Sequence, residues 1–308
     1  MLEEQTEQRS QARLDDGEKE QVRSVMRLRS PAIYEVIRRQ GQEELHRPAV
    51  SLAAAGVAAG VTMGLSVVAQ ALLRAHLPDQ PWAEMIEHLG YSLGFLIVIM
   101  SRLQLFTENT ITAVLPICAY PTARNFLAVA RLWAIVLVGN VVGTLIFAAF
   151  IRFSAALSPD TLAAFVKICE HLLEVSPARA LAGGVVSGFL IACLVWMAPI
   201  VRGAELWMVL IVTYVIALGG FSHVVVGSAE AWFLVLNGSA GLGHVTAAYI
   251  LPALLGNIIG GTGLFTLLAY TQVFTELDDV GESATTEEKL EAAEEKEESA
   301  AERETEGR

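Results

Sequence analysis

The sequence predicts an all-α integral membrane protein with six transmembrane helices, of which the second and the fifth are broken. Three observations lead to this fold class. The 308 residues are 54% hydrophobic, with a mean hydropathy of +0.50. Only 18% of them are charged, whereas a soluble chain carries about a quarter. The apolar residues gather in blocks between two charged tails, and two of the blocks are too long for one simple crossing.

The two tails differ from the rest of the chain in composition. Residues 1–48 are polar with mixed charge, and we expect a cytoplasmic segment that is helical near Ser24–Arg39. Residues 272–308 are rich in Glu, Lys and Ala and are expected to form an acidic, charged cytoplasmic tail. The first apolar run begins near Ala49, behind the polar segment, which argues against a cleavable signal peptide.

Charge and cysteine content limit the classes of partner. The net charge is −12 and the pI is about 5.0, which argues against nucleic acid as a partner. Cys118, Cys169 and Cys193 lie far apart and match no metal-binding spacing, so we expect structural roles for them. We therefore expect neither a metal nor a cofactor.

Residues 49–271 form the predicted six-helix channel domain. Its apolar blocks run over 49–73, 89–118, 129–151, 179–201, 206–236 and 245–270. A helix needs about 20 apolar residues to cross a bilayer, so four blocks fit one helix each. The second block carries Arg102, Gln104, Thr107, Glu108 and Asn109 at mid-length, and the fifth carries Gly219, Gly220, Ser222 and His223. Because backbone polar groups cannot stay unpaired in lipid, each break must be covered by protein or line a cavity, as in transport sites.

Basic residues are distributed unequally between the connecting loops. Arg38, Arg39 and Arg47 precede the first block. Arg124 and Arg131 flank the loop between the second and third blocks, and Arg202 lies between the fourth and fifth. The opposite loops, 76–88, 153–178 and 237–244, contain few basic residues. This bias and the even number of spans predict that both termini are cytoplasmic.

The two halves of the apolar region resemble each other. The first half has Leu105-Phe106-Thr107-Glu108-Asn109 followed by Gly139-Asn140-Val141-Val142-Gly143, and the second has Gly220-Phe221-Ser222-His223 followed by Gly256-Asn257-Ile258-Ile259-Gly260. The spacing from Thr107 to Asn140 is 33 positions, and that from His223 to Asn257 is 34. With three spans in each half, the second copy enters the membrane from the opposite side. The pattern predicts an inverted repeat whose broken helices meet near the midplane, with structural roles for Asn140, Gly143, Asn257 and Gly260. Each half also opens with a helix of small residues, whose spacing lets helix backbones pack closely: Gly56, Gly60 and Gly64, then Gly183, Gly184 and Gly188.

These pieces resemble the formate/nitrite transporter family. The matching segments are Ser92-Leu93-Gly94, Leu105-Phe106-Thr107-Glu108-Asn109, Gly139 to Gly143, Val195-Trp196-Met197, Gly219 to Val225 and Gly256 to Gly261. The resemblance covers about 45–270 and implies an aquaporin-like protomer, assembled as a homopentamer with a pore in each protomer. It also implies passage of formate, nitrite or a related short monocarboxylate, by a channel or with a proton, across a membrane such as the bacterial inner membrane.

The resemblance implies roles for particular residues. His223 matches the family's central pore histidine and Thr107 the threonine of the opposing loop, and Asn109 is expected to belong to the pore with them. Phe106 and Phe221, beside the breaks, are expected to help form apolar constrictions. The chain also departs from the family: Arg102-Leu103-Gln104 replaces Gly-Ala-Glu, Glu108 replaces a small residue, Gly188-Phe189 replaces Asn-Trp, and Gly227-Ser228 replaces Asn-Met. These changes affect the polar lining of the pore and leave its substrate open.

The chemistry of an anion pore accounts for a histidine at this position. A bare anion in hydrocarbon is very unfavourable, so a pore must replace its hydration. Half-helices that begin after the breaks present N–H groups and a positive dipole end. We hypothesise that the anion accepts a proton or hydrogen bond from His223 and crosses as the neutral acid. The alternative is a structural histidine bound to the backbone at a helix break; a capping role is likewise open for Thr107.

Three charged residues within the spans need their own explanation. Intramembrane charges are rare and are usually paired. For Arg102 and Glu108 we favour a mutual salt bridge that fixes the break, over a pore-lining role. Glu230 reaches either a pore vestibule or the outer surface, and the sequence leaves this open.

Three other classes of protein compete with an anion pore. An enzyme is not expected, because the apolar region lacks a metal cluster, a Ser-His-Asp set or paired carboxylates. A neutral-solute channel of the aquaporin type would carry Asn-Pro-Ala repeats, which do not occur. A non-transporting protein built on the same fold stays open as an alternative.

Overall fold

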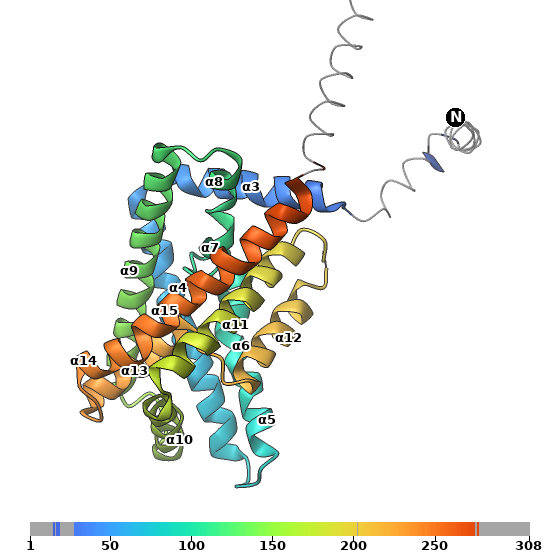
Figure 1. The fold of residues 1–308 in the computed structure, drawn as a ribbon. Helices are drawn as coiled ribbons and strands as arrows, with labels where there is room; N and C mark the ends of the chain where they lie inside the picture. Colours follow the sequence, from blue (N-terminus) through green and yellow to red (C-terminus); the bar gives the residue numbers. More distant parts are fainter. Residues whose placement is uncertain (1–14, 16, 19–27, 202, 275, 277–308) are drawn as a thin grey trace, which may run out of the picture.

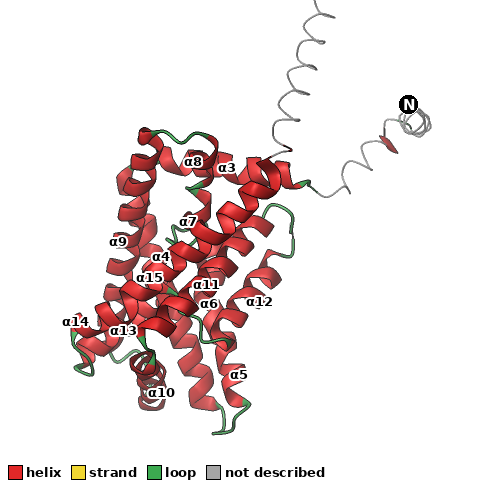
Figure 2. Ribbon diagram, in the orientation of Figure 1, coloured by secondary structure: helices red, strands yellow, loops and turns green. Residues whose placement is uncertain are grey.

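The structure is a computed structural model, and it describes residues 15, 17–18, 28–201, 203–274 and 276. In this part of the chain every regular element is a helix, as the colouring in Figure 2 shows. The helices form one bundle, with α3 (Ser30–His46) and α8 (Leu115–Ala119) at one end (Figure 1). The opposite end carries α5 (Ala83–Glu87), α10 (Pro159–Glu170) and α14 (Leu242–Val245).

Five helices are long and apolar enough to cross a membrane. They are α4 (Ala49–His76), Ala83–Met100, α9 (Ala123–Phe153), α11 (Pro177–Met197) and Leu242–Phe274. The second contains α5, η1 (His88–Tyr91) and α6 (Ser92–Met100), and the last contains α14, η3 (Thr246–Ile250), α15 (Leu251–Ile258) and η4 (Ile259–Thr266). The remaining apolar span is built from two shorter helices, α12 (Glu205–Leu218) and α13 (Val224–Asn237).

The second and fifth spans are broken where the sequence predicts it. After α6 the chain leaves helical conformation and resumes it at α7 (Asn109–Thr112), which leads into α8. After α12 the segment 219–223 turns sharply before α13 begins. Gly220 makes that turn with a φ of 59°, in the left-handed region that a residue with a side chain seldom adopts. The last span also contains two π-helical stretches, η3 and η4, which widen the turns of the helix.

The N-terminal helix begins later than the sequence predicts. It was expected near Ser24–Arg39, whereas α3 runs over Ser30–His46, and residues 19–27 lie outside the described part. Pro31 suits the first helical turn, and the helix ends before Pro48, which cannot continue it. The buried face of α3, which includes Tyr34 and Ile37, packs against α7 and α8.

One helix lies in a region that was predicted to be only a loop. Within 153–178, α10 begins behind Ser158, whose hydroxyl accepts a hydrogen bond from the Thr161 N–H, and is followed by η2 (His171–Glu174). Phe165 of α10 packs edge-to-face on Phe233 of α13, with ring centroids 4.8 Å apart. The helix is too short and too amphipathic to cross a bilayer, which explains why hydropathy alone did not indicate it.

The halves of the repeat use the same close packing. In the first half α4 lies against α9, and a Cβ added at Gly60 or Gly143 would overlap backbone atoms of the facing helix. In the second half α11 lies against α15 and η4, and Gly184 and Gly260 have the same restriction. The glycines let the helix backbones touch, so each pair positions its broken neighbour.

Candidate pore

The two breaks meet inside the bundle at Thr107 and His223. The Thr107 Oγ1 lies 2.8 Å from the Nε2 of His223, and both side chains are buried. This contact joins segments 116 residues apart in the sequence. It agrees with the prediction that the broken helices approach each other in the interior.

His223 is also the residue that caps the second half-helix. It lies at the N-cap of α13, where its Nδ1 accepts a hydrogen bond of 3.4 Å from the Val226 N–H. Because a backbone N–H can only donate, Nδ1 must carry a lone pair. The neutral ring therefore has its proton on Nε2 and donates it to Thr107; this tautomer is assigned from the hydrogen-bond network.

The other side of the imidazole is apolar. The ring of Phe95 packs edge-to-face on His223, with centroids 4.9 Å apart, and His223 is 1% exposed. From the sequence, free N–H groups at the start of α13 are expected to bind the anion. The Val224 N–H donates instead to Asn257 Oδ1 at 2.9 Å, and the Val226 N–H donates to His223. Two of the first three N–H groups of α13 are thus engaged, and the Nε2–H of His223 adds a further donor at this end of the helix.

Asn140 fixes the first break. Its Oδ1 accepts from the Phe106 N–H at 2.9 Å, and its Nδ2 donates to the carbonyls of Gln104 at 2.8 Å and Gly56 at 2.9 Å. One buried amide thus satisfies backbone groups on both sides of Leu105, which the lost helix leaves without partners.

Asn257 performs the same function at the second break. Its Oδ1 accepts from Val224, while its Nδ2 donates to the carbonyls of Ser222 at 3.1 Å and Gly184 at 2.9 Å. The hydroxyl of Ser187 adds a further donor to the Ser222 carbonyl, which has no equivalent among the hydrogen bonds of Asn140. The asparagine of each repeated Gly-Asn element therefore holds one break together through hydrogen bonds to the backbone. We call these two sets of hydrogen bonds, made by Asn140 and by Asn257, the clasps.

Asn109, Phe106 and Phe221, which the sequence also indicates as pore residues, have three different surroundings. The Nδ2 of Asn109 donates to Gln104 Oε1 at 3.1 Å and to the Leu105 carbonyl at 3.0 Å. Its amide therefore bonds to residues of the first break itself. Phe106 is fully buried and packs edge-to-face on Trp133 of α9, with centroids 5.6 Å apart. Phe221 lines the cavity described below.

The predicted salt bridge between Arg102 and Glu108 is wrong. Among the ion pairs of the described residues none joins these two side chains. Arg102 is exposed and has a φ of 52°, in the turn that follows α6. Glu108 is half-buried at the start of α7. The prediction treated both residues as enclosed at the break, but the turn carries Arg102 outwards, where water or lipid headgroups can solvate it.

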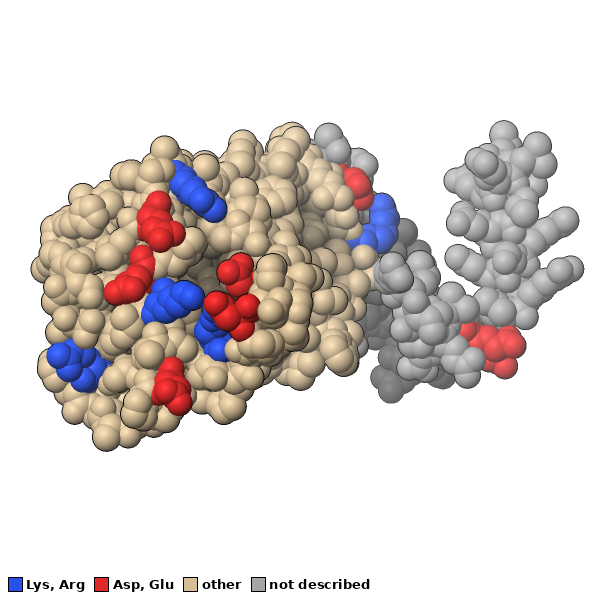
Figure 3. Space-filling model, turned by 90° about the horizontal axis from the view of Figure 1, so that it is seen from below, with Lys and Arg blue, Asp and Glu red and all other residues tan. Residues whose placement is uncertain are grey.

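A cavity of about 680 Å³ opens from the second break to the α10 end of the bundle. Its inner part includes Phe221, Ser222, Gly227, Glu230 and Tyr249. Its mouth carries charged residues of both signs, and Figure 3 shows such charges around a hollow. The charged residues of the mouth are Arg74, Glu84, Glu87, Lys167, Glu170, Glu174 and Arg179. We call this cavity the α10-side vestibule. Glu230 belongs to the vestibule, which decides between the two positions that the sequence left open.

Several vestibule residues were not identified from the sequence. Gln70, Tyr91 and Tyr249 come from α4, η1 and η3, and no short motif connects them. One signal was available: Glu230 follows His223 by seven positions and Gly227 by three, a spacing that places all three on one face of α13. No group of three His, Cys, Asp or Glu side chains suited to a metal is found in the described part of the chain.

Fold and site together define a membrane pore protein of the broken-helix type, with a buried Thr–His pair between two clasped breaks. The sequence matches the family described as Formate/nitrite transporter over residues 31–271. The chain belongs to this family. Among curated relatives, "Inner membrane protein YfdC" of Escherichia coli (strain K12) is 41% identical over 251 residues, covering 82% of this chain and 81% of that protein. "Formate channel FocA" of Haemophilus influenzae is 25% identical over 237 residues, covering 67% and 81%.

Solved structures share the fold. A "Pentameric formate channel with formate bound" superposes with a TM-score of 0.64 at 20% identity, covering 74% of this chain and 98% of that one. An "FNT family ion channel" gives 0.65 at 18% identity, covering 79% and 98%. The predicted fold class, an all-α membrane protein with an aquaporin-like inverted repeat and broken second and fifth helices, is confirmed.

Proposed function

We propose that this chain carries a small monovalent anion, such as formate, nitrite or a related short monocarboxylate, through a pore in each protomer of a homopentamer. The observation that carries the proposal is the buried hydrogen bond between Thr107 and His223 at the junction of the breaks. Family membership and the names of the formate channels among its relatives and neighbours support it. The name of the relative "Inner membrane protein YfdC" supports the bacterial inner membrane, and the basic loops favour termini in the cytoplasm.

The geometry suggests how the pore lowers the cost of losing hydration. An anion that arrives from the α10-side vestibule meets two donors, the Nε2–H of His223 and the hydroxyl of Thr107, which are hydrogen-bonded to each other when no anion is present. Turning both toward the anion exchanges one neutral hydrogen bond for two charge-assisted ones, which are stronger. The apolar ring of Phe95 lies on the other side of the imidazole, so water competes little for these donors.

His223→Asn tests the donor role without removing the helix cap, because asparagine is itself a preferred N-cap residue. In liposomes containing the purified protein we expect formate uptake to fall at least about tenfold, since losing a hydrogen bond to a charged group costs about 1.5–3 kcal/mol. The exposed His244 provides the matched control, His244→Asn, which should transport like the wild type.

Three outcomes separate the alternatives. Flux that is lost only in His223→Asn supports the proposal and, with nitrite, acetate, lactate and hydrosulfide also tested, gives the substrate class. Unchanged uptake by the variant contradicts the donor role. Absence of any anion flux from the folded, oligomeric wild type would point to a neutral-solute channel or a non-transporting protein.

A further inference from the structure

Glu230 is a carboxyl group within the membrane domain, and the mechanism above gives it no role. It lines the α10-side vestibule on the same face of α13 as His223 and Gly227. No ion pair or hydrogen bond within the described residues engages its side chain, and its oxygens are not among the sealed, unpartnered atoms. The carboxyl group therefore faces the space of the vestibule.

Tyr249 connects the position of Glu230 with that of His223. Its ring lies against Gly227, where a Cβ would overlap the phenol, and its hydroxyl lies near Ser222 and the backbone of His223. The π-helical stretch η3 holds this tyrosine, and such bulges often occur at functional sites. Glu230, Tyr249 and His223 thus follow one another from the vestibule toward the centre of the bundle.

The titratable groups that face Glu230 come from three packed elements besides its own helix. They are Tyr91 of η1, Cys169 of α10 and Tyr249 of η3, none of which carries a charge when protonated. The side of α4 that lines the vestibule contributes the uncharged Gln70. The cations Arg74, Lys167 and Arg179 lie at the mouth, where Arg74 already pairs with Asp79 at 2.6 Å. Near Glu230 the walls thus offer no fixed cation, and a carboxyl group there accepts a proton readily.

His223 is poorly placed to supply a proton. To give one up and remain a neutral imidazole, it must first be protonated on Nδ1. The Nδ1 atom accepts a hydrogen bond from the Val226 N–H. If Nδ1 carried a proton, two N–H donors would face each other and the capping hydrogen bond of α13 would be lost. His223 therefore acts as a hydrogen-bond donor, and a proton that travels with the anion needs another source.

We propose that Glu230 is this source: a substrate-contacting proton donor that converts the anion to its neutral acid on the α10 side of the pore. This rests on the proposed function. The O–H bond of the Glu230 carboxyl group breaks and a new O–H bond forms on the carboxylate or nitrite, leaving Glu230 ionised. The open vestibule then returns a proton from the aqueous phase. Near Glu230 an anion meets the same walls without a fixed cation, so its proton affinity rises as that of the glutamate does, and the transfer between them is close to balanced.

The test is the pH dependence of formate uptake by Glu230→Gln. Proteoliposomes are held at the same pH on both faces, so the orientation of the protein does not matter, and the flux of protein-free liposomes is subtracted. Above the pKa of formic acid, the free acid becomes about tenfold scarcer with each pH unit. Without a donor the uptake should follow the free acid, falling about tenfold per unit from pH 5 to pH 7, whereas the wild type should change less than about threefold over the whole range.

Variants separate a donor from a structural residue. Glu230→Asp keeps an acid and should keep the shallow profile, and Glu43→Gln, at an exposed carboxylate of α3 outside the vestibule, should behave like the wild type. Tyr249→Phe tests the same path through another residue and should steepen the profile partially. A uniform loss of flux at every pH in Glu230→Gln, or a profile identical to that of the wild type, overturns the proposal.

The two proposals fail differently. Flux that depends on His223 but keeps the wild-type profile in Glu230→Gln overturns only the donor role of Glu230. A wild type that passes no anion at any pH overturns the proposed function and the donor role with it.

Discussion

The two breaks share one pattern of hydrogen bonds to an asparagine, but their surroundings in the bundle differ. The first, 101–108, is the longer segment, and Gln104 within it donates from Nε2 to Glu44 Oε2 of α3 at 3.0 Å. The second, 219–223, turns at Gly220 and opens directly to the α10-side vestibule. An inverted repeat thus gives the pore two unequal mouths, one covered by the N-terminal helix and the other hollow and charged.

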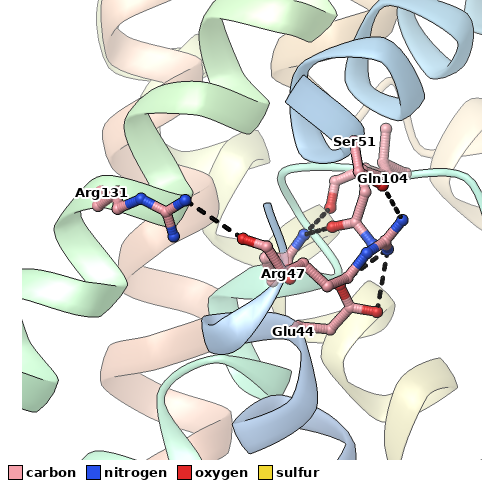
Figure 4. Close-up of polar contacts among 7 residues, drawn as sticks. Glu44, Arg47, Ser51, Gln104 and Arg131 are labelled. Atoms are coloured by element: carbon pink, nitrogen blue, oxygen red, sulfur yellow. Dashed lines mark hydrogen bonds and ion pairs between the residues drawn. The ribbon is translucent and has the colours of Figure 1, made fainter. Parts of the chain in front are cut away.

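The cover over the first break is a polar network (Figure 4). Arg47 pairs with Glu44 at 2.9 Å and donates to Ser51, and Arg131 donates to the Arg47 carbonyl at 3.2 Å. Glu44 therefore connects the N-terminal helix with the break through Gln104. The second break has no such cover, and its clasp instead has the additional hydroxyl of Ser187. The comparison shows that the same asparagine hydrogen bonds can hold a break that another helix covers and a break that opens to a cavity.

The largest expected effect comes from removing the clasps. Asn140→Leu leaves the Phe106 N–H and the Gln104 carbonyl without the partners described, whereas in Asn257→Leu the Ser222 carbonyl keeps Ser187. Each orphaned buried group costs about 1–3 kcal/mol, so both variants should be strongly destabilised, and Asn140→Leu more so by about one such group. The apparent melting temperature of the purified oligomer measures this difference. Equal losses would show that Ser187 does not support the second clasp.

A smaller effect is expected at the cover. Glu44→Gln removes the charge that accepts from Gln104 and pairs with Arg47. The side chains of Glu44 and Arg47 are partly exposed, so the loss should be about 1 kcal/mol. That corresponds to about fivefold faster hydrogen exchange in 101–108 and in α3. The neighbouring exposed Glu43 gives the control, Glu43→Gln, and the second break should not respond. Faster exchange in 219–223 as well would mean that the two mouths are coupled.

The smallest effect is a pH dependence of helix α3, which carries Glu44 of the cover. The hydrogen bond from Arg38, with a further one from Arg39, holds the pKa of Glu35 at about 2, below its ordinary value of 4.5. Because this pKa is lowered in the folded protein, the ion pair stabilises α3 fully above about pH 4.5 and is lost as the pH falls toward about 2. Since the side chain of Glu35 is about a third exposed, Glu35→Gln should cost less than about 1 kcal/mol at pH 7.

Hydrogen exchange of α3 at several pH values checks this prediction. The difference between Glu35→Gln and the wild type should shrink between pH 4.5 and pH 2, while the segment 219–223 stays unaffected. A difference that is constant with pH would assign the effect to packing of the side chain and not to its charge.

Local chemistry explains which sequence predictions succeeded. The spans, the breaks and the repeated Gly-Asn elements follow from apolar runs, from polar groups at mid-span and from spacing, all of which are written along the chain. The same reasoning missed α10, because hydropathy indicates only segments long enough to cross a bilayer. It was wrong about an Arg102–Glu108 pair, because sequence proximity does not tell on which side of a turn a side chain emerges.

The sequence by itself determined the class of protein. Because backbone polar groups in lipid must be hydrogen-bonded within the protein, the long apolar blocks and their interruptions predict a six-span helical membrane protein with two breaks. Tertiary structure alone decided which side chains complete those breaks and what lies around them. The contact of His223 with Thr107, the hydrogen bonds of Asn140 and Asn257 and the place of Glu230 each depend on atoms from helices far apart in the chain. Such contacts are set by the packing of whole helices, which no local pattern records.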